Sequence, residues 1–273
     1  MKKLLKVTTI LTAIVLLLAA CGQNKSGEKD DKKIVVAATP TPHGQVVKKA
    51  AEQLKDKGYK VEVREVNDYK IPNKLLDEGD VDANMFQHVP YLNAEKKSHG
   101  YKIEEVGKVL TTPMGVYSKK HKSLKDLPKG AKIFISNNPA EEGRFLSFFV
   151  KEGLIKIKDG VKIEDAKLDD IVENKKDLKF DNQQGAEFLP KTYNNNEGDA
   201  VIMNSNYAID NGLKPLEDSI AVEDESSPFA NVLAVQEGHK DDQKFKDLLA
   251  ALQSDETRQY IEDEFDGAVL PAK

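Results

Sequence analysis

The chain has 273 residues, with 41 basic and 46 acidic side chains and a formal net charge of −5. This balance argues against a nucleic-acid binder, which needs a basic face, and a single cysteine excludes an intramolecular disulfide and any Cys-rich metal site. With 39% hydrophobic residues the chain can bury a core, and its length suits one large or two modest domains.

The first twenty residues have the features of a secretory signal. Three lysines precede an uncharged apolar stretch, residues 7–20, which is shorter than the ~20 apolar residues that a membrane-spanning helix needs. The stretch ends in Leu18-Ala19-Ala20-Cys21, which is similar to the lipobox of bacterial lipoproteins. We predict that residues 1–20 are a signal peptide and that Cys21 carries lipid, leaving a mature net charge of −8. The alternative is an ordinary signal peptide followed by an unrelated cysteine.

Residues 21–33 form a polar, charged segment after the predicted cleavage point. This composition is typical of a flexible tether between a lipid and a folded domain. We therefore expect a protein anchored by lipid at the extracytoplasmic face of the cell membrane.

The rest of the chain alternates short apolar runs with segments of helical periodicity. Residues 34–38 are apolar throughout, as in a strand buried on both faces, and residues 45–57 have helical spacing before Gly58. Further strands are predicted at 60–66, 81–85, 114–118, 132–136, 200–203 and 232–235. Further helices are predicted at 71–78, 139–152, 205–211 and 241–264. The alternation predicts an α/β protein with mostly parallel sheets.

The length of the mature chain favours two lobes over a single sheet. We place lobe 1 at residues 34–111, lobe 2 at 112–228 and a C-terminal return to lobe 1 at 229–273. The chain would cross between the lobes near residues 110–113 and 223–228.

Polar side chains gather where four of the predicted strands end. These residues include His43, His88, Asn138 and Asn204. Because ligands of open α/β sheets bind beyond the carboxyl ends of the strands, we expect these side chains at a binding cleft. They supply amides and imidazoles but no evident nucleophile.

Arg144 stands out because the chain has only three arginines among its 41 basic residues. It lies in a predicted helix that begins after an Asn138-Pro139 cap and is rich in apolar residues. An arginine in this setting suggests that a planar fork is needed, and bidentate binding of a carboxylate is the usual reason. The alternative is an ion pair with Glu141, three residues earlier, on a solvated face.

The stretch Asp82–Leu92 is dense in aromatic and amide side chains. Phe86, His88 and Tyr91 could line a pocket. A histidine beside a strand end is also often a structural hydrogen-bonding group, so both interpretations of His88 stay open.

Together with other segments, this stretch resembles the NlpA family, the methionine-binding lipoproteins of ABC importers. The resemblance runs in colinear order along the mature chain. It rests on Cys21, Pro42-His43, Asn67-Asp68-Tyr69, Pro72-Asn73, the DAN-x-FQH-x-PYL run of 82–92, Tyr117-Ser118-Lys119, Asn138-Pro139 with Arg144, 153–155, 204–208 and 227–231. It implies a two-lobed periplasmic-binding-protein fold with a mixed sheet in each lobe and a ligand cleft between the lobes.

The resemblance also implies roles for individual residues. Arg144 would bind the carboxylate of an amino-acid ligand, and Asn204 and Asn231 would hydrogen-bond its polar atoms. An aromatic and imidazole wall would surround a thioether, because sulfur packs favourably on aromatic rings. The residues implied for this wall are Tyr69, Phe86 and His88.

Three departures from the family pattern leave the ligand open between L-methionine, a methionine-containing dipeptide such as glycyl-methionine, and another amino acid. They are Ala140-Glu141 where relatives more often have Thr-Asn, Met85 where an aromatic residue is frequent, and Asn206 where Thr is common. The implied partners are an ABC permease and its ATPase. We expect no enzymatic activity, no cofactor and no metal site.

Other classes of protein remain as alternatives. A metal-binding lipoprotein would need clustered histidines, whereas the five histidines are scattered along the chain. A secreted hydrolase would need a nucleophile–base motif such as G-x-S-x-G or H-E-x-x-H, and the sequence has neither. An adhesin role on the cell surface stays open.

Overall fold

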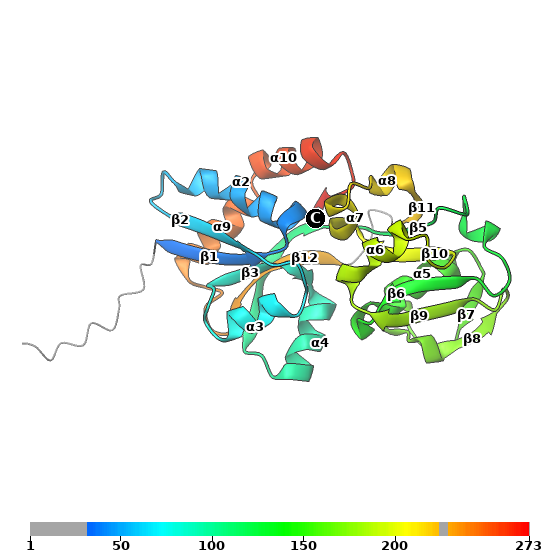
Figure 1. The fold of residues 1–273 in the computed structure, drawn as a ribbon. Coiled ribbons are helices and arrows are strands. Elements are labelled where there is room, and N and C mark those ends of the chain that lie inside the picture. The colour runs from blue at the N-terminus through cyan, green and yellow to red at the C-terminus, as the bar shows by residue number, and fades with distance from the viewer. Residues whose placement is uncertain (1–31, 224–228, 273) are drawn as a thin grey trace, which may run out of the picture. The chain divides into compact units, whose positions relative to one another are not determined.

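The computed structural model describes residues 32–223 and 229–272, the body of the chain. The predicted signal peptide, Cys21 and all but the end of the predicted tether lie outside the described residues. Within the body, the strands form two main sheets, one in each lobe, and a small two-stranded sheet (Figure 1).

The first sheet has six strands. In spatial order they are β13 (Leu270–Pro271), β4 (Ile103–Thr111), β12 (Ala230–Gln236), β3 (Ala83–His88), β1 (Lys33–Ala38) and β2 (Lys60–Glu65). β1 runs parallel to β2 and β3, whereas β12 runs antiparallel to both β3 and β4. The sheet is therefore mixed and not mostly parallel, because β12 arrives from the second lobe and enters between β3 and β4.

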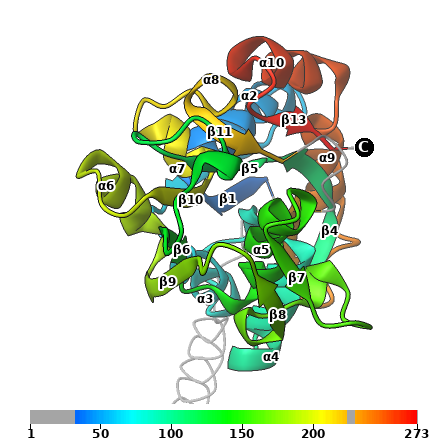
Figure 2. The same cartoon turned by 90° about the vertical axis from the view of Figure 1, so that its right-hand side faces the viewer.

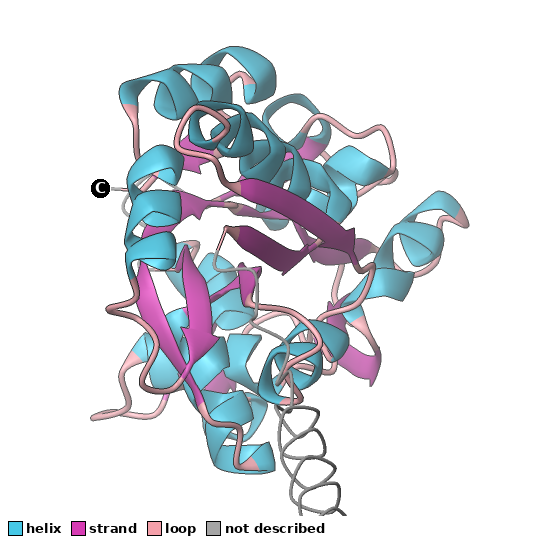
Figure 3. Cartoon of the chain, turned by 90° about the vertical axis from the view of Figure 1, so that its left-hand side faces the viewer, coloured by secondary structure: helices cyan, strands magenta, loops and turns pink. Residues whose placement is uncertain are grey.

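Helices cover both faces of this sheet (Figures 1 and 3). One face carries α2 (Gln45–Leu54), α9 (Gln243–Leu252) and α10 (Asp255–Phe265), and the other carries α3 (Ile71–Asp77) and α4 (Val89–His99). Successive strand residues point to opposite faces, so Ile34 and Val36 of β1 join the α2 side while Ala37 joins the α3 side. Burial on both faces explains the continuous apolar run of β1.

The second sheet has five strands. In spatial order they are β11 (Ser219–Val222), β5 (Met114–Tyr117), β10 (Ala200–Asn204), β6 (Lys132–Ser136) and β9 (Lys179–Gln184). β6 is parallel to β10 and β9, whereas β5 is antiparallel to β10 and β11. A mixed sheet in each lobe is the arrangement that the resemblance implies, and this prediction is confirmed.

The helices of the second lobe also lie on opposite sides of their sheet, as Figure 2 shows for α5 (Glu142–Lys151) and α6 (Leu189–Asn194). The other regular elements of this lobe are α7 (Ser205–Asp210), α8 (Pro215–Asp218) and the antiparallel pair β7 (Ile155–Ile157) and β8 (Ile171–Asn174). Short helical turns complete the chain: η1 (Pro40–Gly44), η2 (Leu124–Asp126), η3 (Pro139–Glu141), η4 (Ile163–Asp165), η5 (Leu168–Asp170) and η6 (Ala186–Phe188). None of the described helices is long and apolar enough to cross a bilayer.

The chain passes from the first sheet to the second between β4 and β5, at Thr112 and Pro113, and returns between β11 and β12. Of the second crossing, residues 224–228 lie outside the described residues. The lobe boundaries that we place at 111/112 and 228/229 stay predictions.

Some elements differ from their prediction. The helix predicted over 241–264 is two helices, because Ser254 caps a new one by accepting a hydrogen bond from the Thr257 amide. The helix predicted over 139–152 starts as the turn η3 and continues as α5. β4 has no counterpart among the predicted strands, because its Glu104, Glu105 and Lys108 interrupt the apolar alternation.

Gly143 of α5 lies close to the backbone of η4. A Cβ added there would lie 2.1 Å from the carbonyl oxygen of Ile163 in η4. A Gly→Ala change inside a helix ordinarily raises the free energy of unfolding by about 1 kcal/mol. Here the methyl group has no space, so α5 and η4 would have to separate.

We expect Gly143→Ala to lower the free energy of unfolding by about 1–3 kcal/mol, the cost of overpacking a well-packed site. Urea unfolding followed by circular dichroism measures the effect. Gln259→Ala on the exposed face of α10 is the control and should stay within about 0.5 kcal/mol of wild type. A Gly143→Ala variant as stable as wild type contradicts the close approach.

Candidate functional site

A small cavity lies between the two lobes, where β3, β6 and β10 end. Its volume is ≈ 10 Å³, room for about one water molecule. The lining residues are Tyr69, Phe86, Gln87, His88, Tyr91, Thr112, Asn138, Glu141, Asn204 and Asn231. Five of the six residues predicted to bind ligand are in this set. The sixth, Arg144, lies directly behind the wall.

Aromatic rings form one side of the cavity. The Tyr69 ring centroid lies 6.0 Å from that of Phe86 and 6.3 Å from that of Tyr91, and the Phe86 and Tyr91 rings meet edge to face. Tyr69 reaches across to the second lobe, where its hydroxyl donates to Asn206 Oδ1 at 2.7 Å. These rings give the wall a polarizable, mostly apolar surface.

The end of β3 presents Phe86, Gln87 and His88 to the cavity. Gln87 also belongs, with Asn84, to a buried amide cluster around Asn73. Gln87 Nε2 donates to Asn73 Oδ1 at 2.6 Å, and Asn84 Nδ2 donates to the same oxygen at 2.9 Å. Part of the DAN-x-FQH motif therefore holds β3 against α3.

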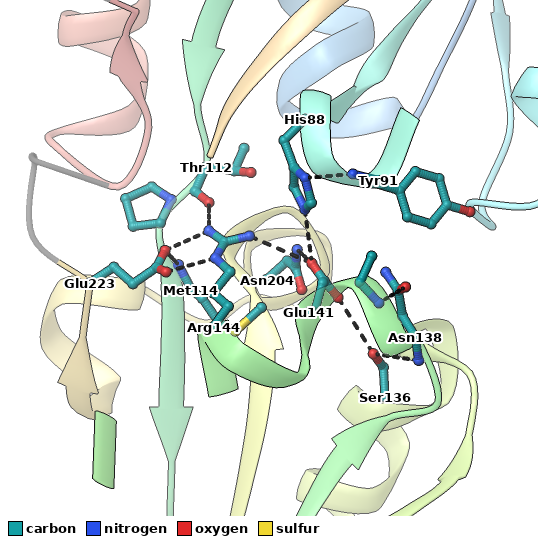
Figure 4. A network of polar contacts seen from close by, with 12 residues as sticks. His88, Tyr91, Thr112, Met114, Ser136, Asn138, Glu141, Arg144, Asn204 and Glu223 are labelled. Atoms are coloured by element: carbon teal, nitrogen blue, oxygen red, sulfur yellow. Dashed lines mark hydrogen bonds and ion pairs between the residues drawn. The ribbon is translucent and has the colours of Figure 1, made fainter. Parts of the chain in front are cut away.

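His88 is buried, and burial lowers its pKa even though the neighbouring carboxylate of Glu141 opposes the shift. Its Nδ1 accepts a hydrogen bond from the Tyr91 amide at 3.1 Å, which caps α4. The proton of the neutral ring therefore sits on Nε2, which points to Glu141 Oε1 at 3.5 Å (Figure 4). His88 thus combines a structural cap with a place in the cavity wall.

Glu141 lines the cavity, whereas the sequence points to it only as a possible ion-pair partner of Arg144 and as a departure from the family pattern. Its carboxylate is buried among groups from both lobes, and Asn204 Nδ2 donates to Oε1 at 3.0 Å. Burial alone would raise its pKa, but the hydrogen bond from His88 and the charge of Arg144 outweigh burial and lower it. The pair with Arg144 exists, at 3.5 Å, yet it is buried and not on a solvated face.

The guanidinium fork of Arg144 is engaged by Glu223, which follows β11. Nε donates to Glu223 Oε1 at 2.6 Å and Nη2 donates to Oε2 at 2.5 Å, while Nη2 also donates to the Thr112 carbonyl at 2.9 Å (Figure 4). Burial opposes the charged form, but the charge of Glu223 raises the pKa of Arg144. The fork predicted for a ligand carboxylate thus binds a carboxylate of the chain itself. Only Nη1 faces the cavity side, toward Glu141.

Asn231, on β12, is oriented by three hydrogen bonds. Its Nδ2 donates a long one to the Phe86 carbonyl, at 3.5 Å. His43 Nε2 and Thr112 Oγ1 both lie 3.1 Å from its Oδ1. An amide oxygen only accepts, so His43 carries its proton on Nε2 and accepts from Thr39 Oγ1 at Nδ1, 2.6 Å away. The amino group of Asn231 is therefore the part that can serve a ligand.

Among the described residues, no group of three or more His, Cys, Asp or Glu side chains could hold a metal ion.

Comparison with known proteins extends over the whole folded part. A family model described as NlpA lipoprotein matches residues 34–273. The methionine-binding lipoprotein MetQ of Bacillus subtilis (strain 168) is 46% identical over 273 residues, covering 99% of each chain.

Two solved structures are also similar. A nutrient binding protein from Burkholderia cenocepacia bound to methionine is 41% identical with a TM-score of 0.82, covering 88% of this chain and 100% of that one. An ABC transporter periplasmic substrate-binding protein from Coxiella burnetii is 38% identical with a TM-score of 0.81, again covering 88% and 100%.

His43 gives a pH prediction, because burial lowers its pKa from 6.5 to about 4. As pH falls from about 7.5 to 4, the unfolded chain takes up the proton first, so the imidazole costs stability. The loss approaches about 3 kcal/mol at the low end. His43→Gln, which keeps a donor for Asn231, lacks this loss. Urea unfolding of both proteins over the pH range measures it, and a difference between them that does not change with pH contradicts the assignment.

Proposed function

Because the chain belongs to the NlpA lipoprotein family, we propose that it is a substrate-binding lipoprotein of an ABC importer that captures methionine between its lobes. The observation that carries the proposal is the composition of the cavity wall. Aromatic rings line one side, and amide and carboxylate groups, with a guanidinium behind them, form the other. An amino acid with a soft, apolar side chain is complementary to this division.

The orientation of the amides supports particular roles. The amino group of Asn231 and Nη1 of Arg144 are donors suited to a carboxylate, whereas Asn204 donates to Glu141 and keeps its Oδ1 as an acceptor. Tyr69, Phe86 and His88 supply the surface for the thioether. Since Nη1 alone of the Arg144 donors is directed to the cavity side, we propose an end-on contact with the ligand carboxylate and not a fork.

Binding requires the lobes to separate and close again. The ≈ 10 Å³ cavity is too small for an amino acid, and two hydrogen bonds join the lobes next to it. Tyr69 bonds to Asn206, and the Tyr207 hydroxyl donates to the Asn67 carbonyl at 3.0 Å. A ligand that adds contacts across the lobes would stabilise the closed form around itself, which is the form proposed to dock on a permease.

Methionine binding is tested by isothermal titration calorimetry of the purified protein. We expect binding of L-methionine, and Asn231→Asp should weaken it about a hundredfold. This change keeps the acceptor for His43 and Thr112 but replaces the amino group with an anion that repels the ligand carboxylate.

The matched control is Asn195→Asp, which alters an exposed asparagine in the second lobe and should leave the affinity unchanged. Thermal unfolding in the same buffer checks that both variants are folded. Equal affinities for wild type and Asn231→Asp contradict the proposed carboxylate contact. Absence of binding to both methionine and glycyl-methionine contradicts the proposed ligand class.

We propose lipid at Cys21 as the membrane anchor, since the matching family is one of lipoproteins. Cys21→Ser in the full chain removes the sulfur that carries the lipid, so the protein should move from the membrane to the soluble fraction. Fractionation of expressing cells followed by immunoblotting measures this. Ser147→Ala, far from the N-terminus, is the control, and a Cys21→Ser protein that stays in the membrane fraction contradicts the anchor.

A further inference from the structure

The carboxylate of Glu141 has weak hydrogen bonding for a group so deeply buried. Only the bond from Asn204 Nδ2, at 3.0 Å, is of ordinary length. His88 Nε2 and Arg144 Nη1 both lie 3.5 Å from Oε1, and the Ser136 hydroxyl lies 3.4 Å from Oε2. A buried carboxylate offers about four acceptor positions, and leaving them poorly used is costly. Glu141 therefore has capacity for a strong donor on its cavity side.

The charges around Glu141 point to the kind of donor. Arg144 is the cation of the group, and it faces two carboxylates, Glu141 and Glu223. Glu223 takes the shorter contacts, at 2.5 and 2.6 Å, so most of the positive charge is already matched. Burial and the neighbouring arginine keep His88 neutral, because its pKa is lowered. Glu141 is thus the carboxylate that receives the longer and weaker contact of this cation, at 3.5 Å.

The groups beside Glu141 are acceptors as well. Because Asn204 uses its amino group on Glu141, its Oδ1 is the atom that can receive a proton donor. Asn231 Nδ2 and Nη1 of Arg144 are donors, and Nη1 lies beside the acceptors, 3.5 Å from Glu141 Oε1. The division of the polar wall is therefore one of chemistry, into acceptors suited to a cation and donors suited to an anion.

From this division we infer that Glu141 binds the α-ammonium group of the ligand and selects for ligands with a free, protonated amine. The inference rests on the proposed function and adds to it a residue and a specificity rule. An ammonium group donates three hydrogen bonds, and Glu141 and Asn204 Oδ1 supply acceptors for at least two. A ligand that lacks the amine leaves the buried carboxylate without its cation, so its binding is weakened.

The rule is tested with two pairs of ligands that differ only in the amine. L-Methionine is paired with 4-(methylthio)butanoate, and glycyl-methionine with N-acetyl-methionine. We measure the affinities by calorimetry. In the pair that contains its preferred ligand, the wild-type protein should bind the ligand with the amine about tenfold to a hundredfold more tightly than the ligand without it. Glu141→Gln should lose this preference, because it weakens only the ligand that carries the amine.

The matched control is Glu142→Gln, the same chemical change one residue along the chain. Glu142 does not line the cavity, and its Oε2 accepts a hydrogen bond from the Leu168 amide at 2.8 Å. The Glu142→Gln protein should therefore have the same ligand preference as wild type. Thermal unfolding of both variants reports on folding.

Two outcomes overturn the inference while leaving the proposed function in place. One is a wild-type protein that binds the ligand without an amine as tightly as its partner, a result that needs no variant. The other is a Glu141→Gln variant that weakens both members of a pair equally. Wild-type protein that binds neither methionine nor glycyl-methionine overturns the proposed function itself, and the ammonium assignment with it.

Discussion

The buried contact between Arg144 and Glu223 connects the parts of this molecule that must cooperate. Arg144 belongs to α5 of the second lobe, Glu223 belongs to the segment that returns to the first lobe, and Thr112 lies in the outgoing crossing. Glu223 also accepts a hydrogen bond from the Met114 amide at 2.8 Å. One guanidinium thus joins both chain crossings. Because removing one partner of a buried ion pair leaves an unmatched charge, the arrangement tolerates little change.

This contact also determines which donors and acceptors are available in the cavity wall. With its fork on Glu223, Arg144 directs only Nη1 toward Glu141, so Glu141 receives a single, longer contact from this cation, at 3.5 Å. Asn231 and Asn204 are fixed in opposite senses, since one uses its oxygen within the protein and the other its amino group. In the closed arrangement Asn231 of β12, from the first lobe, lies at the same cavity as Glu141 of η3 and Asn204 of β10, from the second lobe.

Much of the fold and of the site follows from sequence pattern, for identifiable reasons. The run Ile34–Ala38 is apolar because helices cover both of its faces, and the strand-end rule brings His88, Asn138 and Asn204 to one place. Glu141 is harder to find, because one carboxylate among 46 acidic residues looks like a solvated helix start. The available signal is its position between Pro139 and Arg144 at the start of an apolar helix. The partner of Arg144 could not be predicted, since Glu223 is 79 residues away.

The scarcity of arginine gains a physical explanation from these contacts. A lysine at position 144 could offer one point charge with three donors, and its ammonium could not span Glu223 and Thr112 while still facing Glu141. The rigid guanidinium does all three because its five donors point outward in one plane. The sequence suggests that a planar fork is needed at position 144, and the structure uses one. Most of its donors, however, bind Glu223 and Thr112 in the segments that connect the two lobes. Ligand recognition would use the remaining edge together with the carboxylate that this edge faces.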